Sequence, residues 1–553
     1  GRILITGLND VTINSKIGHD NPGLSEVTII AESGTLTLAK EAGNIETASK
    51  LSLKGQNLVI EGVLTSLNAT DTLTDYEVTM QASQDAIISG SFDLAGSLLI
   101  KAGRDLSIFN TGISTDKDGQ RITAQAGRDI LLGNVYPAAG DTQSYGAIIE
   151  ADSLIEMKAA GQIVVGADAQ LYTETDNSEI KLKASTLQLV GSVRAGADYD
   201  VETGSFAWTG NDATLDLRSD KATYIGGKGL SVANEYALID AGGSLAATGQ
   251  VLLRAGKDAS DVGVSLTKES SITTNANFGG LTDTSDSAIQ INSTGQLQLS
   301  GVIRAEDEGA DISLSSNSLT FIDNLVYANN QLNIQGGTHS SKVGVWVKNI
   351  VLDGTGFVSG GALETGEDGG ISITANDGVF IQGQVGKRLV DPNNASIFNE
   401  VTGTAAIHSS SGNVNLVGVV AVKNDIRLSG GQVNILAGGY AYATSDQSKV
   451  FIQARNAISL SAAASAVPPE NIPAIVKGDA LIHLSAPLVS IAGIIEVTGE
   501  NGLLLLNAGS QLSITGQVTS AGDMRLQAGV NTQLAREVLE NTIDVDGLSD
   551  GII

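Results

Sequence analysis

The sequence predicts an all-β solenoid, a parallel β-helix, and three observations support this prediction. A short alternating apolar and polar pattern recurs along nearly the whole chain, equivalent positions recur at intervals of 20 to 32 residues, and helix signals are almost absent. A globular chain of 553 residues would divide into several domains, whereas a solenoid grows along one axis because each repeat contacts only its neighbours. We therefore predict one continuous β-helix domain over residues 1–535, with residues 536–553 forming a C-terminal edge or a linker.

Alternation is clearest in segments such as Ile371–Val385 and Leu503–Val518. Successive side chains of a strand point to opposite faces, so Leu and the β-branched residues of these segments are expected inside each coil. The intervening Ser, Thr, Gln, Asn and Asp are expected outside. Gly and Asn between the runs supply the tight turns that lead from one face to the next.

Recurring Ala residues give the repeat period. Ala102 and Ala126 are 24 residues apart, Ala486 and Ala508 are 22 apart, and Ala508 and Ala528 are 20 apart. A unit of this size cannot bury its own apolar face, so neighbouring units must stack with parallel strands about 4.8 Å apart. The chain then forms roughly 20–25 coils. Longer loop excursions are predicted near residues 134–147, 196–213, 257–287, 338–350, 384–404 and 462–478.

Composition excludes several functional classes. Acidic residues outnumber basic ones by 61 to 32, giving a net charge of -29, which disfavours a nucleic acid or an anionic membrane as partner. The absence of cysteine excludes a disulfide framework, thiol catalysis and thiolate metal sites. No segment approaches the 18 consecutive apolar residues of a membrane helix, so we predict no transmembrane segment.

Two short runs carry a resemblance to a known family. Gly522–Gly529 and Ala126–Leu132 resemble the repeats of filamentous haemagglutinin-type large exoproteins. The second run begins with Ala-Gly-Arg-Asp, a tetrapeptide that also occurs at 102–105. The resemblance implies a right-handed parallel β-helix and secretion by the two-partner route through an outer-membrane transporter. It also implies an extracellular or cell-surface location and a role in adhesion, contact or matrix building.

The same tetrapeptide repeats an Asp beside a cation. Asp105 follows Arg104, Asp129 follows Arg128, and Asp258 follows Lys257. An active site is normally built once, so recurrence favours a structural turn in which Asp caps backbone amides or pairs with its basic neighbour. The four histidines, which are His19, His339, His408 and His483, show no metal-ligand spacing, and no Gly-x-Ser-x-Gly elbow is present. We predict no catalytic residue and no cofactor.

Acidic segments and aromatic residues are the remaining candidates. Weak calcium candidates are Glu306, Asp307, Asp311, Asp544, Asp546 and Asp550. Their oxygen ligands suit calcium, but no segment completes a twelve-residue binding loop, so solvated loops are favoured and calcium stays open. The aromatics Tyr199, Phe206, Trp208 and Trp346 lie in predicted excursions. Each either anchors its excursion on the solenoid, which is favoured, or stacks on a sugar ring or another protein.

These observations favour a non-catalytic extracellular rod-like adhesin or structural exoprotein that displays loops or assembles into a filament or sheath. The alternative is a carbohydrate-active β-helix enzyme, such as a polysaccharide lyase or hydrolase, or a glycan-binding rod. An exposed groove with three or more carboxylates beside an Arg would favour the enzyme. Expected partners are other copies or neighbouring repeats through unpaired strand edges, and a host or cell-surface protein or glycan.

Overall fold

The computed structural model describes most of the chain. The described residues are 1–18, 25–40, 43–47, 50–66, 76–115, 119–133, 146–200, 205–226, 244–247, 249–274, 288–306, 309–348, 351–353, 356–359, 361–366, 369–386, 403–463 and 472–529. Over these residues the regular elements are all strands. The chain divides into two compact units, residues 1–313 and 314–553. The predicted single domain over 1–535 stays a prediction, and 536–553 lie outside the described residues.

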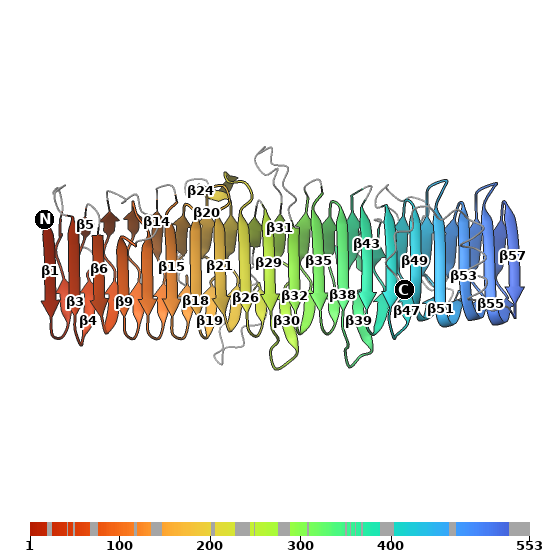
Figure 1. Ribbon diagram of the computed structural model, residues 1–553, viewed down its shortest axis with the longest axis horizontal. Coiled ribbons are helices and arrows are strands. Elements are labelled where there is room, and N and C mark those ends of the chain that lie inside the picture. Colours follow the sequence, from red (N-terminus) through yellow and green to blue (C-terminus); the bar gives the residue numbers. More distant parts are fainter. Residues whose placement is uncertain are drawn as a thin grey trace. The chain divides into compact units, whose positions relative to one another are not determined.

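A typical coil of the described chain contains three short strands. In one coil of unit 1 these are β18 (Leu154–Ala159), β19 (Gln162–Val165) and β20 (Gln170–Thr173), and the next coil begins with β21 (Glu179–Ala184), which pairs with β18 in parallel. We name the three surfaces that these strands build face 1, face 2 and face 3, in chain order. Within each unit the chain winds in the right-handed sense (Figure 1). The predicted right-handed parallel β-helix is therefore confirmed.

The three faces of unit 1 are built from parallel pairs between successive coils. Face 1 consists of β1 (Arg2–Gly7), β3 (Glu26–Ala31), β6 (Lys50–Gly55), β9 (Val78–Ala82), β12 (Leu98–Ala102), β15 (Arg121–Ala126), β18, β21, β26 (Thr214–Ser219), β29 (Gln250–Ala255) and β32 (Ala288–Ser293). Face 2 consists of β2 (Val11–Ile13), β4 (Thr35–Leu38), β7 (Asn57–Ile60), β10 (Ala86–Ile88), β13 (Leu106–Ile108), β16 (Ile130–Leu132), β19, β22 (Thr186–Leu189), β27 (Thr223–Ile225), β30 (Val262–Leu266) and β33 (Gln296–Leu299). Face 3 consists of β5 (Ile45–Thr47), β8 (Leu64–Ser66), β11 (Phe92–Leu94), β14 (Thr111–Thr115), β17 (Ala147–Ala151), β20, β23 (Ser192–Ala195), β28 (Ser244–Ala247), β31 (Ser271–Thr274) and β34 (Val302–Ala305).

Unit 2 repeats this plan, and the unit boundary falls within β35 (Asp311–Ser316). Its face 1 continues with β38 (Gln331–Gly336), β43 (Gly370–Ala375), β46 (Thr404–Ser409), β49 (Asp425–Ile435), β51 (Lys449–Leu460), β53 (Leu481–Ile491), β55 (Leu503–Ile514) and β57 (Asp523–Ala528). Its face 2 consists of β36 (Thr320–Ile322), β39 (Val343–Val347), β44 (Gly378–Ile381), β47 (Val414–Leu416) and the second halves of β49, β51, β53 and β55. Its face 3 consists of β37 (Leu325–Ala328), β42 (Ala362–Thr365), β45 (Gln384–Val385), β48 (Val419–Val422), β50 (Tyr440–Ala443), β52 (Ile475–Gly478), β54 (Ile494–Val497) and β56 (Gln517–Ser520).

The described residues contain twenty strands that open a coil on face 1, eleven up to β32 and nine from β35 onward. This number is at the lower end of the 20–25 coils that the repeat period predicts. In β49, β51, β53 and β55 the strands of faces 1 and 2 are joined across a bulge, whereas in unit 1 a turn separates them.

The interior is filled by the alternating apolar residues. In β18 the side chains of Ile155 and Met157 are buried, and those of Glu156 and Lys158 are exposed. Inward residues of successive coils lie in register. Ile155 is aligned with Ile122 of the coil before and with Ile180 of the coil after, and both of these are buried as well. Each such Ile or Leu contributes about 1.5–3 kcal/mol when fully buried. Stacking therefore supplies the core that a single coil lacks.

The corner between face 1 and face 2, which we name the tight corner, is built from small residues. Ala102 and Ala126 end the strands of face 1 there, and Gly103 and Gly127 follow them. A Cβ on Gly127 would lie 2.0 Å from the carbonyl oxygen of Gly103 in the coil before. Only glycine leaves room for this close approach between backbones.

The other two corners carry the longer connections. Two antiparallel hairpins lie there, β24 (Ala197–Asp200) with β25 (Ser205–Trp208), and β40 (Val351–Asp353) with β41 (Gly356–Ser359). The prediction of an excursion over 257–287 was wrong in part because it includes β30 and β31, and that over 338–350 was wrong in part because it includes β39. In both segments inward valines, leucines or isoleucines continue the face. Of the remaining excursions, 134–145, 387–402 and 464–471 lie outside the described residues.

Candidate functional site

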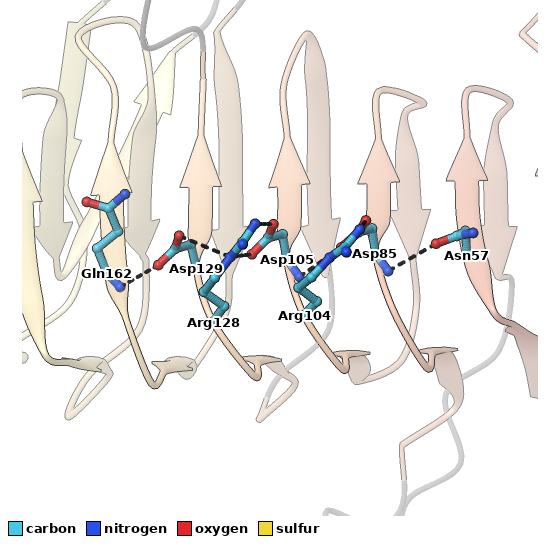
Figure 2. A network of polar contacts seen from close by, with 7 residues as sticks. All are labelled: Asn57, Asp85, Arg104, Asp105, Arg128, Asp129 and Gln162. Atoms are coloured by element: carbon cyan, nitrogen blue, oxygen red, sulfur yellow. Dashed lines mark hydrogen bonds and ion pairs between the residues drawn. The ribbon is translucent and has the colours of Figure 1, made fainter. Parts of the chain in front are cut away.

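The Arg and Asp residues of the recurring tetrapeptide meet along the tight corner (Figure 2). Arg104 Nε donates to Asp85 Oδ1 at 2.7 Å, and Arg128 Nε donates to Asp105 Oδ1 at 2.7 Å. In both pairs the arginine contacts the carboxylate of the preceding coil. The prediction of a structural turn is confirmed. Arg128 also pairs with its own neighbour, since its Nε lies 3.6 Å from Asp129, but the shorter contacts join each arginine to the preceding coil.

Backbone amides complete this ladder. The Asp105 amide donates to Asp85 Oδ1 at 3.2 Å, and the Gln162 amide donates to Asp129 Oδ1 at 2.9 Å. The Arg104 hydrogen bond is the main reason that the pKa of Asp85 lies below its ordinary value. The Ala-Gly-Arg-Asp motif therefore forms contacts that join one coil to the next.

The lysine version of the motif has different contacts. Asp258 Oδ1 accepts the amides of Ser260 at 2.8 Å and Val262 at 2.9 Å, which confirms its predicted role as a cap of backbone amides. Tyr224 donates its hydroxyl to Asp258 Oδ2 at 2.5 Å, and this contact and burial raise the tyrosine pKa to about 12. Lys257 Nζ lies 3.0 Å from Asp261.

The calcium candidates are only partly described. The Oε1 atom of Glu306 lies 3.1 Å from Nη1 of Arg304, and Asp311 is the first residue of β35. Asp307, Asp544, Asp546 and Asp550 lie outside the described residues. Within the described ranges no group of three His, Asp or Glu side chains is arranged to hold a metal ion. Calcium binding stays a hypothesis.

Three of the aromatic candidates lie in one hairpin. Tyr199 of β24 pairs with Phe206 of β25, and Ala197 pairs with Trp208. The hairpin follows β23 at the corner that leads from face 3 to face 1. The side chains of Tyr199, Phe206 and Trp208 lie outside the described part of the structure, so their two predicted roles stay open.

Trp346 lies in a strand rather than in an excursion. It occupies the outward position of β39, in register with Phe321 of β36 and Phe380 of β44. Ring centroids are 5.4 Å apart for Phe321 and Trp346 and 6.0 Å apart for Trp346 and Phe380. The indole Nε1 donates to Gln382 Oε1 at 2.8 Å. The three rings therefore pack on one another over face 2 of unit 2.

The described histidines have separate surroundings. His339 Nδ1 lies 2.7 Å from Ser341 Oγ, His408 Nδ1 lies 2.8 Å from Ser429 Oγ, and His483 Nε2 lies 3.1 Å from Asn507 Nδ2. Burial lowers the pKa of His483 to about 4. His19 lies outside the described residues.

A carboxylate cluster that sequence reasoning missed lies on face 3 of unit 1. Glu150, Tyr172 and Arg194 stand in register on three successive coils. Tyr172 donates its hydroxyl to Glu150 Oε2 at 2.6 Å. Burial, with Glu150 beside it, raises the pKa of Glu174 to about 9, and Asp198 and Asp152 add to this effect.

The Glu174 carboxyl therefore keeps its proton to a higher pH than an ordinary glutamate does, and Glu150 lies beside it. Such a pair can hold and transfer a proton. Tyr172 is only 1% exposed and Asp152 is 9% exposed, whereas Glu150, Glu174, Arg194 and Asp198 are half-buried. No spacing pattern in the sequence marks these residues, because only the register between coils brings them together.

Long connections flank face 3 on both sides. Between face 2 and face 3 the strands are separated most widely from Leu132 to Ala147, Ile225 to Ser244, Val347 to Ala362 and Leu460 to Ile475. Between face 3 and face 1 they are separated most widely from Ser66 to Val78, Ala195 to Thr214, Thr274 to Ala288 and Val385 to Thr404. At the tight corner the longest connections between the strands of the described chain are Gly256–Asp261 and Gly337–Lys342.

Comparisons with known proteins give no match: no family model fits the chain, and no curated protein and no solved structure is significantly similar to it. The likeness to filamentous haemagglutinin-type repeats therefore stays a prediction. None of the described residues belongs to a helix that could span a membrane.

Proposed function

We propose that this protein is a non-catalytic extracellular scaffold that presents the connections beside face 3 to a cell-surface protein, a glycan or other copies of itself. The proposal includes export through an outer-membrane transporter, as the likeness to exoprotein repeats implies. One observation carries it: the long connections of both units occur at the two ends of the face 3 strands, and the tight corner has short ones. Connecting segments held by a rigid scaffold are where recognition residues concentrate.

The internal use of the recurring charged motif supports the non-catalytic part. Arg104 and Arg128 contact carboxylates of neighbouring coils, and these contacts repeat along the corner. A repeated ladder suits cohesion between coils, whereas a catalytic site needs one arrangement of groups around one substrate.

The test replaces a long connection with a short one from the same corner. In the variant, residues 226–243 are replaced by the dipeptide Val190-Gly191, which joins β22 to β23 one coil earlier. Binding of the full chain and of the variant to immobilised matrix proteins, to glycans and to cells is compared, with circular dichroism as the control for folding. We expect at least one ligand class to bind the full chain and to bind the folded variant at least tenfold more weakly. Equal binding by both proteins, or no binding by either, contradicts the proposal.

A carbohydrate-active enzyme is the second candidate. The observation that favours it is the group of carboxyl residues Glu150, Glu174, Asp152 and Asp198, in which burial and the neighbouring Glu150 raise the pKa of Glu174. The full chain is incubated with a panel of polysaccharides and the release of reducing or unsaturated ends is measured. Product formation that is lost in Glu174→Gln and kept in Glu156→Gln, an exposed residue of face 1, would establish the enzyme and overturn the scaffold proposal.

A further inference from the structure

One outward row of face 1 in unit 1 collects cations. The row lies directly before the small residue that ends each face 1 strand, and its members pair in register from coil to coil. We name it the cationic stripe. Over the nine coils from β6 to β32 it consists of Lys54, Gln81, Lys101, Gln125, Lys158, Lys183, Arg218, Arg254 and Asn292. Thr6 and Ile30 precede it in the same row and are not part of the stripe. All nine are exposed, six are cations and none is acidic.

Four of these cations occupy successive coils, which is unfavourable for the isolated protein. Lys158, Lys183, Arg218 and Arg254 stack at the coil spacing of about 4.8 Å, and like charges directly opposite each other destabilise a sheet. Elsewhere in unit 1 a register pair combines opposite charges, as Arg2 does with Glu26 at 3.0 Å. Cohesion between coils therefore does not explain the stripe.

The stripe also keeps most of its charge available to solvent. In the described part of the structure Lys54, Lys101, Lys158 and Lys183 form no ion pair. Arg218 and Arg254 share one carboxylate, because Arg218 Nε lies 3.0 Å and Arg254 Nη1 lies 3.4 Å from Asp216 Oδ1. Asp216 is itself 6% exposed, and it orients two arginine side chains that are about half exposed.

We propose that the cationic stripe binds a linear acidic polysaccharide, one with a carboxylate or sulfate on its sugar units, laid along the direction in which the coils stack. A polyanion relieves the repulsion between stacked cations and pairs with several of them at once. A chain with one anionic group per sugar ring places its charges at a spacing comparable with one coil. The stripe thereby gives the chemistry of a partner on face 1, independently of the connections beside face 3.

A nucleic acid suits the stripe less well. In a B-form duplex each strand carries one phosphate per roughly 3.4 Å of helix axis, a repeat that differs from the coil spacing of about 4.8 Å. Proteins that bind single strands combine cations with aromatic rings on which bases stack. The next outward row of face 1 contains Thr123, Glu156, Lys181, Asp216 and Leu252, none of which is aromatic. In the described part of the chain, the one ring in contact with these residues is that of Tyr76, which already contacts Thr123 and Arg121.

The test measures binding of the full chain to heparin, to polygalacturonate and to single- and double-stranded DNA by isothermal titration at low and at physiological salt. We expect one of the two polysaccharides to bind, with an affinity that falls as salt rises. In the variant K158Q/K183Q/R218Q/R254Q the affinity is expected to fall about a hundredfold, as the loss of four exposed ion pairs implies.

A matched control removes four exposed cations away from the stripe, in K16Q/K40Q/K268Q/K342Q, so that both variants change the net charge equally. This control is expected to bind within about twofold of the parent, since distant exposed charges are screened. An equal loss in both variants, no polysaccharide binding by the parent, or stripe-dependent binding of DNA that is tighter than that of either polysaccharide would overturn the proposal.

A single variant guards against misfolding as the cause. Lys183→Glu places a carboxylate between Lys158 and Arg218 and is expected to keep or raise the melting temperature while weakening polysaccharide binding at least tenfold. Unchanged binding by this variant would also contradict the proposal.

Discussion

Unit 1 and unit 2 differ at the same position of the coil. The row of unit 2 that precedes the small residue at the end of face 1 contains Gln335, Thr374, His408, Ser429, Gln453, Ser485, Asn507 and Gln527. None of them is Lys or Arg, Ser485 is 6% exposed and Asn507 is 3% exposed. Where unit 1 stacks cations that face solvent, unit 2 stacks neutral side chains, and two of these, His408 and Ser429, hydrogen bond to each other.

This difference shows that a coil geometry does not determine the chemistry of its surface. The backbone places one side chain above another at every coil. The residue type decides whether the side chains of a row form hydrogen bonds with one another or remain free to bind a ligand. Neutral hydrogen-bonding rows contribute to stability, whereas a row of like charges lowers it and is kept for binding.

The largest expected contrast is in the response to acid. Burial lowers the pKa of His483 in unit 2 from an ordinary 6.5 to about 4, so below pH 6.5 the unfolded chain binds a proton that the folded chain does not. Stability is therefore expected to fall by about 3 kcal/mol as the pH drops from 6.5 to 4. Urea unfolding at several pH values measures this, and His483→Gln should lack this part of the loss. An unchanged pH profile in that variant would show that another group is responsible.

The next contrast concerns two asparagines at equivalent positions of the two rows. Asn507 of unit 2 is buried against His483, so Asn507→Ala is expected to cost about 1–2 kcal/mol of unfolding free energy. Asn292 of unit 1 is exposed, and Asn292→Ala should change stability by less than about 0.5 kcal/mol. Equal losses of unfolding free energy in the two variants, measured by chemical denaturation, would contradict the distinction between the packed row of unit 2 and the solvated row of unit 1.

A smaller effect is expected from charge reversal in the stripe. Lys183→Glu should raise the unfolding free energy by about 0.5–1 kcal/mol at low salt, and the gain should disappear near 1 M salt. Gln453→Glu, at the matching position of unit 2, has Ser429 and Ser485 beside it in register and should not show this gain. Thermal unfolding over a salt series separates the two outcomes.

The smallest effect is expected at the tight corner. The pKa of Asp85 is held low by Arg104, so the contact stabilises the fold above the ordinary carboxylate pKa and loses this contribution as the pH falls. Because the pair is exposed, Asp85→Asn should cost at most about 0.5 kcal/mol at neutral pH. Asp220→Asn, at the same corner, is the control and should cost less. A loss above 1 kcal/mol in the melting curves would mean that the ladder is more than a surface contact.

The fold was predictable from sequence because period-two alternation and a recurrent Ala residue are both local signals. Trp346 was placed wrongly because the turn residues before it suggested an excursion, although Val345 and Val347 flank it as inward residues of β39. The structural role of the Asp residues was predictable as well, because the tetrapeptide that contains them recurs.

The stripe and the carboxylate cluster could not be found in the same way. Lys158 and Lys183 are 25 residues apart, but Lys183 and Arg218 are 35 apart because the β24–β25 hairpin lies between them. A net charge of -29 argued against a nucleic acid or an anionic membrane and gave no sign of a cationic row, since composition gives the sum of the charges and not their arrangement. Aligning the residue before each recurrent Ala, as at Ala102 and Ala126, was the one signal that could have revealed the row.

The tight corner also affects how such a chain can change length during evolution. Lys101 precedes Ala102 and Gln125 precedes Ala126 at the same point of two successive coils. Deleting residues 102–125 removes one whole coil and joins Lys101 directly to Ala126. Since Lys101 already precedes an Ala at the end of a face 1 strand, the backbone around the new peptide bond keeps its conformation. Duplications and deletions of whole coils at this point preserve every inward position, so selection can lengthen or shorten the molecule without redesigning its core.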